Sequence, residues 1–162
     1  MNDLDQMYQQ IILDAAHERR GEGELDPFDG ESFQVNPTCG DQVNLRVRMS
    51  DDGGRIAEVA WTGEGCSISR ASIGIMIDML EGASVDEAKD LYEQFRALMD
   101  SRGAGLTEDV EEALGDAAAF VGVAKFPMRI KCALLGWMAM RDATDKAVAA
   151  LSPAASEGGV NV

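Results

Sequence analysis

The chain has 162 residues, of which 46% are hydrophobic, and a chain of this size can bury a core within one domain. Its 14 lysines and arginines stand against 29 aspartates and glutamates, which gives a formal net charge of -15. The negative electrostatic potential of such a chain repels nucleic-acid phosphates and anionic membrane surfaces, so neither is expected as a partner. A protein with a basic patch or a bound cation suits this potential better.

Nothing in the sequence predicts export or membrane insertion. The first ten residues lack the basic region and apolar run of a signal peptide, and no apolar stretch reaches the length of a membrane span. The three cysteines are an odd number, whereas secreted domains of this size usually carry even disulfide sets. We therefore expect a soluble cytoplasmic protein whose cysteines remain thiols.

The first half of the chain predicts a helix followed by a small antiparallel sheet. Apolar residues recur at helical spacing from about Asp3 to Arg20, and an acidic loop with Pro27 follows. Apolar and polar residues then alternate over 33–36, 43–49 and 57–61, with turn sequences between these runs. Alternation of this kind is typical of strands that bury one face.

The second half predicts four helices. One follows Cys66 and stops at Gly82, and a capping box at Ser84 opens the next. A third should run from Thr107 to about Val121, and a long fourth from Pro127 to about Ala150. The expected fold class is α+β, with a three-stranded antiparallel sheet and helices packed on one face. We expect one domain over residues 1–150 and a disordered tail over 151–162.

The candidate metal-ligating and reactive residues are the three cysteines and Asp41, and each cysteine lies near the end of a predicted helix or strand. Cys39 and Asp41 flank Gly40, which can take a positive φ and direct both side chains to one point. Cys66 lies at a helix start, where the positive end of the helix dipole favours a thiolate. Cys132 falls in the first two turns of the last helix, where its thiolate would benefit in the same way.

Three thiolates and one carboxylate would make a four-coordinate site for zinc, or for iron in a cluster. Such a zinc site carries a local charge of about -2, which Arg129 and Lys131 beside Cys132 would partly offset. Spacing alone leaves two alternatives open. The cysteines fit ordinary buried positions as well, and the two cations fit a solvated helix face.

The cysteine segments also resemble a known family. They read Asn36-Pro37-Thr38-Cys39-Gly40-Asp41, Gly65-Cys66-Ser67-Ile68-Ser69 and Arg129-Ile130-Lys131-Cys132. Together, and in this order, they resemble the IscU/NifU-like iron-sulfur scaffold family, and specifically its SufU branch. The resemblance covers about Leu4 to Ala150 and includes a helical insertion at about 92–120, which is typical of SufU proteins.

This resemblance implies that Cys39, Asp41, Cys66 and Cys132 bind zinc. It further implies that Cys39 accepts sulfane sulfur from the persulfide of a SufS-type cysteine desulfurase, which makes the chain a sulfurtransferase-type sulfur carrier for iron-sulfur cluster assembly. In the family, a histidine of the desulfurase replaces Cys39 at the zinc ion. Other iron-sulfur assembly proteins are then further partners.

One departure separates the chain from IscU scaffolds, which have a histidine just before the third cysteine. This chain has Lys131 there, so that ligand for a cluster is missing. The difference favours a sulfur carrier over a scaffold. Two alternatives remain, namely a scaffold that assembles a transient iron-sulfur cluster on the same ligands, and an interaction domain held together by zinc.

Overall fold

The computed structural model describes residues 3–38 and 40–151, and one three-stranded antiparallel sheet lies within them. Its strands are β1 (Gly30–Asn36), β2 (Asp41–Met49) and β3 (Ile56–Glu64), in the spatial order β1-β2-β3. Each pair of neighbours is joined by a short turn, as the alternating sequence predicts. The expected three-stranded antiparallel sheet is confirmed.

The described helices follow the predicted order, with two additional 3₁₀ segments. They are α1 (Asp3–Glu18), α2 (Ser67–Leu80), α3 (Val85–Asp100), α4 (Glu108–Leu114), η1 (Gly115–Val121), η2 (Val123–Lys125) and α5 (Pro127–Leu151). Ser84 caps α3, because its side chain accepts a hydrogen bond from the Glu87 amide. The expected start of α3 is therefore confirmed.

Two predicted helices end earlier than expected. α1 stops at Glu18 because Arg19 takes a left-handed backbone conformation with φ of 51°. The helix predicted to reach Val121 ends at Leu114, where Gly115 has φ of 54° and leaves the right-handed helical region. Beyond it the chain continues as the tighter turns of η1.

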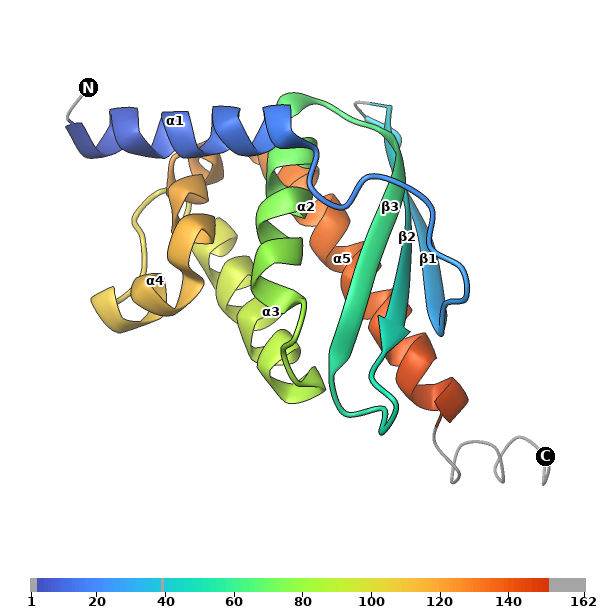
Figure 1. Ribbon diagram of the computed structural model, residues 1–162. Helices are drawn as coiled ribbons and strands as arrows, with labels where there is room; N and C mark the ends of the chain where they lie inside the picture. Colours follow the sequence, from blue (N-terminus) through green and yellow to red (C-terminus); the bar gives the residue numbers. More distant parts are fainter. Residues whose placement is uncertain (1–2, 39, 152–162) are drawn as a thin grey trace.

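The helices lie on one side of the sheet, and α5 packs directly against β1 and β2 (Figure 1). β2 alternates as predicted, because Val43, Leu45, Val47 and Met49 are buried while the residues between them are more exposed. α2 then packs against α5, and α1 crosses α2 near the top of the view in Figure 1. This arrangement is the expected α+β layering.

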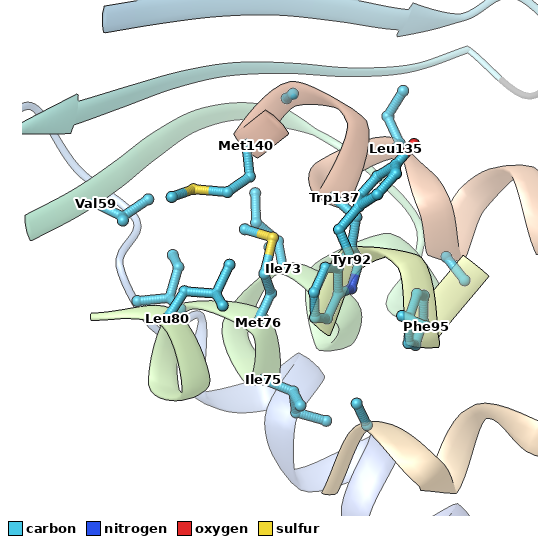
Figure 2. Close-up of a cluster of buried hydrophobic side chains, with 14 of the residues drawn as sticks. Val59, Ile73, Ile75, Met76, Leu80, Tyr92, Phe95, Leu135, Trp137 and Met140 are labelled. Atoms are coloured by element: carbon cyan, nitrogen blue, oxygen red, sulfur yellow. The ribbon is translucent and has the colours of Figure 1, made fainter. Parts of the chain in front are cut away.

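The predicted insertion is anchored in the core by aromatic side chains. Phe95 of α3 stacks on Trp137 of α5, with ring centroids 4.7 Å apart, and meets the edge of Phe120 at 5.7 Å. Figure 2 shows Tyr92, Phe95 and Trp137 beside the aliphatic side chains of α2. α3 and η1 therefore belong to the same hydrophobic core as α2 and α5.

Glycines allow α5 to approach its neighbours closely. A Cβ added to Gly30 of β1 would lie 2.0 Å from the Ala143 carbonyl oxygen, so only glycine fits between β1 and α5. A Cβ on Gly136 would lie 3.1 Å from the Ile73 side chain of α2. These contacts set how near α5 lies to the sheet and to α2.

At the carboxyl end, α5 continues to Leu151, one residue into the segment expected to be a tail. The expectation of disorder for the rest of that segment concerns residues outside the described range. Within the described residues, no helix has both the length and the apolar character needed to cross a bilayer.

Candidate metal centre

Asp41 and Cys66 are brought together by the pairing of β2 with β3. Asp41 is the first residue of β2, and its neighbour Gln42 pairs with Glu64 at the end of β3. The chain leaves β3 through Gly65, and Cys66 is the N-cap residue of α2, as the sequence predicts. Gly40 before Asp41 has φ of 76°, the positive value expected for it.

Cys132 reaches the same place through the packing of α5 on α2. It is the sixth residue of α5 and is buried. Six residues after Cys66, the Ser72 hydroxyl of α2 donates a hydrogen bond of 2.6 Å to the carbonyl oxygen of Ala133, the residue after Cys132. With the close contact between Gly136 and Ile73, this bond holds the amino-terminal halves of α2 and α5 side by side.

The three side chains form a compact set of metal-ligating atoms. One carboxylate oxygen of Asp41 and the sulfur atoms of Cys66 and Cys132 lie within 4.8 Å of one another. Asp41 and Cys132 are buried, whereas Cys66 is exposed. An incoming molecule would therefore reach the group from the side of Cys66.

Hydrogen bonds fix the carboxylate of Asp41 within this set. The Cys66 amide donates to Oδ1 at 3.2 Å, and the Ser69 hydroxyl donates to Oδ2 at 2.5 Å. The Cys132 thiol donates to the Met128 carbonyl oxygen of its own helix at 3.7 Å. The site is thus organised by backbone and hydroxyl groups of α2 and α5.

The donor set fits zinc in both chemistry and size. Thiolates with a carboxylate are typical zinc ligands, and ligand atoms around a tetrahedral zinc ion lie roughly 3.5–3.8 Å apart. The observed spread of up to 4.8 Å needs only a small contraction to reach these separations. Two thiolates and one carboxylate leave one position of a tetrahedron for a fourth ligand.

The fourth predicted ligand, Cys39, lies outside the described residues. In the sequence it stands between Thr38 and Gly40, and the Gly40 amide donates to the Asn36 carbonyl oxygen at 2.9 Å across the connection from β1 to β2. Asn36 pairs with Asp41 in the β1–β2 register. The connection that contains Cys39 therefore begins and ends next to Asp41.

Arg129 and Lys131, the two predicted supporting cations, are both exposed in the first turns of α5. The Arg129 guanidinium lies over the Phe126 ring, 5.0 Å from its centroid. Among the described residues neither cation forms an ion pair, so their role in offsetting the site's charge remains a prediction.

Sequence reasoning missed Ser69 and Ser72 of α2, whose hydroxyls donate to Asp41 of β2 and to Ala133 of α5. A signal for Ser69 was present, because it lies three residues after Cys66 and such residues share one face of a helix. The acceptor of the Ser69 hydroxyl depends on how β2 and α5 pack against α2. The local sequence around Ser69 does not determine this packing.

Comparisons with known proteins agree with the geometry. A family model described as the NifU-like N terminal domain matches residues 7–133. The chain is 37% identical over 146 residues to the zinc-dependent sulfurtransferase SufU of Bacillus subtilis (strain 168), a match that covers 88% of this chain and 92% of the relative. It is 36% identical over 144 residues to the iron-sulfur cluster assembly scaffold protein IscU of Streptococcus pyogenes serotype M1, covering 88% and 86%.

The chain is also similar in fold to a solved structure. It is the crystal structure of a protein assigned as an iron-sulfur cluster assembly scaffold for the SUF system, from Fervidobacterium islandicum AW-1. The TM-score is 0.75 at 30% sequence identity, and the match covers 86% of this chain and 97% of that one. The resemblance noted in the sequence is thereby confirmed.

Proposed function

The chain belongs to the NifU-like N-terminal domain family, and from this premise we propose that it is a zinc-dependent sulfur acceptor for iron-sulfur cluster assembly. Asp41, Cys66 and Cys132 would hold the zinc ion together with Cys39. The observation that carries the proposal is the approach of three ligand atoms to within 4.8 Å, beside the connection from β1 to β2 that contains Cys39. The similarity to a zinc-dependent sulfurtransferase over 88% of the chain supports the same activity.

Cys39 is the proposed sulfur acceptor, and a SufS-type cysteine desulfurase is the proposed donor. The Cys39 thiolate attacks the terminal sulfur of the donor's persulfide, so that a new sulfur-sulfur bond forms at Cys39. The bond to the donor's cysteine breaks, and that cysteine leaves as a thiolate. The transfer needs no external oxidant or reductant, because one persulfide replaces another.

Zinc bound at this site would hold the thiols as thiolates and, being redox-inert, would not oxidise them. Asp41 and Cys132 are buried, and the Asp41 carboxylate accepts hydrogen bonds from the Cys66 amide and the Ser69 hydroxyl, which suits ligands that stay in place. Cys39 falls in the sequence between the end of β1 at Asn36 and the start of β2 at Asp41, and a place in such a connection suits the ligand that leaves to accept sulfur. A reducing compartment such as the cytoplasm would keep all three thiols available.

Metal analysis and a sulfur-transfer assay test this proposal. Protein purified without added metal should contain about one zinc ion per chain and no iron, as a site with thiolate and carboxylate ligands predicts. With a SufS-type desulfurase and cysteine, the chain should raise cysteine turnover and acquire a persulfide. Cys39→Ala should abolish this transfer, whereas Ser67→Ala, an exposed change beside the site, should leave it intact. Full transfer by Cys39→Ala would refute the mechanism.

A second candidate function is a scaffold that assembles an iron-sulfur cluster on the same residues. Relatives named as scaffold proteins, at 36% and 30% identity, favour it. Iron and acid-labile sulfide retained after anaerobic reconstitution and desalting would support the scaffold. Unchanged cysteine turnover with zinc still bound would instead indicate an interaction domain that uses zinc only for stability.

A further inference from the structure

Ser69 contacts all three described candidate ligands at once. Its hydroxyl oxygen lies 2.5 Å from Oδ2 of Asp41, 3.6 Å from Sγ of Cys66 and 3.3 Å from the carbonyl oxygen of Cys132. These three residues belong to β2, to the N-cap of α2 and to α5. Ser69 therefore lies where the three elements of the site converge.

The single hydroxyl proton of Ser69 has a clear preference among these neighbours. Hydrogen bonds from a hydroxyl to a carboxylate are charge-assisted and have lengths of about 2.5–2.7 Å. The contact with Asp41 falls in this range at 2.5 Å, whereas the Cys132 carbonyl oxygen is 3.3 Å away. The proton is therefore donated to Asp41.

This hydrogen bond leaves the carboxylate of Asp41 with a donor on each oxygen. The Cys66 amide holds Oδ1 at 3.2 Å while Ser69 holds Oδ2, so rotation of the carboxylate would break both bonds. The side chain is also buried, so water offers little replacement. Removal of the Ser69 hydroxyl would take away the shorter of these two hydrogen bonds and so weaken the restraint on the orientation of this ligand.

We propose that Ser69 is a positioning residue, which orients Asp41 toward the bound zinc ion and thereby slows the loss of zinc. The inference rests on the metal-binding part of the proposed function and not on sulfur transfer. Groups that hydrogen-bond to a ligand commonly change metal affinity by about 10–100-fold when they are removed. Ser69 acts through Asp41, so its effect should depend on that carboxylate.

The test measures zinc release from the isolated chain into excess chromogenic chelator. Ser69→Ala should speed release by about 10-fold or more, and Ser69→Thr, which keeps the hydroxyl, should restore most of the slow rate. Ser67→Ala is the matched control, because it removes an exposed hydroxyl from the same helical turn. In an Asp41→Ala background, Ser69→Ala should change release less than about 2-fold, since residues that act through one another are not additive.

An unchanged release rate in Ser69→Ala would overturn the proposal. The same conclusion follows if the effect persists undiminished in Asp41→Ala, if Ser69→Thr behaves like Ser69→Ala, or if the parent chain binds no zinc. Circular dichroism and thermal unfolding of the zinc-free variants establish that each one folds. Because no desulfurase is present, a failure of sulfur transfer with normal zinc release would refute the proposed function and leave this inference standing.

Discussion

Ser72 supports the site from within the core, and its removal should cost stability. Its hydroxyl accepts a hydrogen bond of 3.2 Å from the Trp137 indole nitrogen and donates one of 2.6 Å to the Ala133 carbonyl oxygen. Ser72 and Trp137 are each 1% exposed, so water cannot replace the hydroxyl. Ser72→Ala would leave the buried indole N–H without this acceptor, at a cost of about 1–3 kcal/mol.

Urea and thermal unfolding of the zinc-free chain would measure this cost. For a domain of this size, a loss of about 2 kcal/mol lowers the melting temperature by roughly 4–8 °C. A double-mutant cycle with Trp137→Phe isolates the hydrogen bond, because the Phe variant has no N–H to leave unpaired. A loss of stability below about 0.5 kcal/mol for Ser72→Ala would refute this reasoning, because ordinary surface changes fall in that range. An equal loss for Ser72→Ala in the parent chain and in the Trp137→Phe background would refute it as well.

Three further changes test the packing, the charges and the metal. Gly30→Ala would place a Cβ 2.0 Å from the Ala143 carbonyl oxygen and should destabilise the fold by about 2 kcal/mol or more. Gly122→Ala is the control, because a Cβ added there has no neighbouring atom within 4 Å and the backbone φ is -69°. This control should be neutral or slightly stabilising in the same unfolding assay. The pKa of Asp142 is lowered, first by the hydrogen bond from the Ser32 hydroxyl and then by the hydrogen bond from Lys146. The Asp142 carboxylate therefore stabilises the fold fully above its unfolded pKa of about 3.9, and this stabilisation is lost as the pH falls through the folded pKa. Ser32→Ala should therefore cost up to about 1 kcal/mol at pH 7 in zinc-free protein and less near pH 3; a cost that grows toward acid pH would contradict this sign. Removing zinc with a chelator should destabilise the chain by about 4 kcal/mol relative to free zinc at about 1,000 times its Kd, and an unchanged melting temperature would argue against zinc binding to the folded chain.

Local sequence patterns determined most of the fold. Strict alternation over β2 predicts a strand with one buried face, and the structure buries the predicted residues. The caps at Ser84 and Thr107 start helices where the sequence places them, because a side chain that accepts from a backbone amide acts within one turn of chain. These features depend on neighbours in sequence, so they can be read without the tertiary structure.

Part of the candidate site was also accessible from the sequence. Gly40, with its positive φ, and the position of Cys66 at the start of α2 both follow from local rules about glycine and helix ends. The ends of two helices were predicted too late. Gly115 is visible in the sequence, but a glycine within a helical pattern stops the helix only when the surrounding chain favours the turn.

Only the tertiary structure shows how the predicted ligands are brought together and which groups hold them. Cys132 lies 66 residues after Cys66, and their approach depends on how closely Gly136 lets α5 pack on Ile73 of α2. The partner of the Ser69 hydroxyl was equally hidden, because Asp41 arrives from β2 through the pairing of strands. Such contacts join surfaces of different elements, and the side-chain shapes that fit those surfaces together are a property of the packed core.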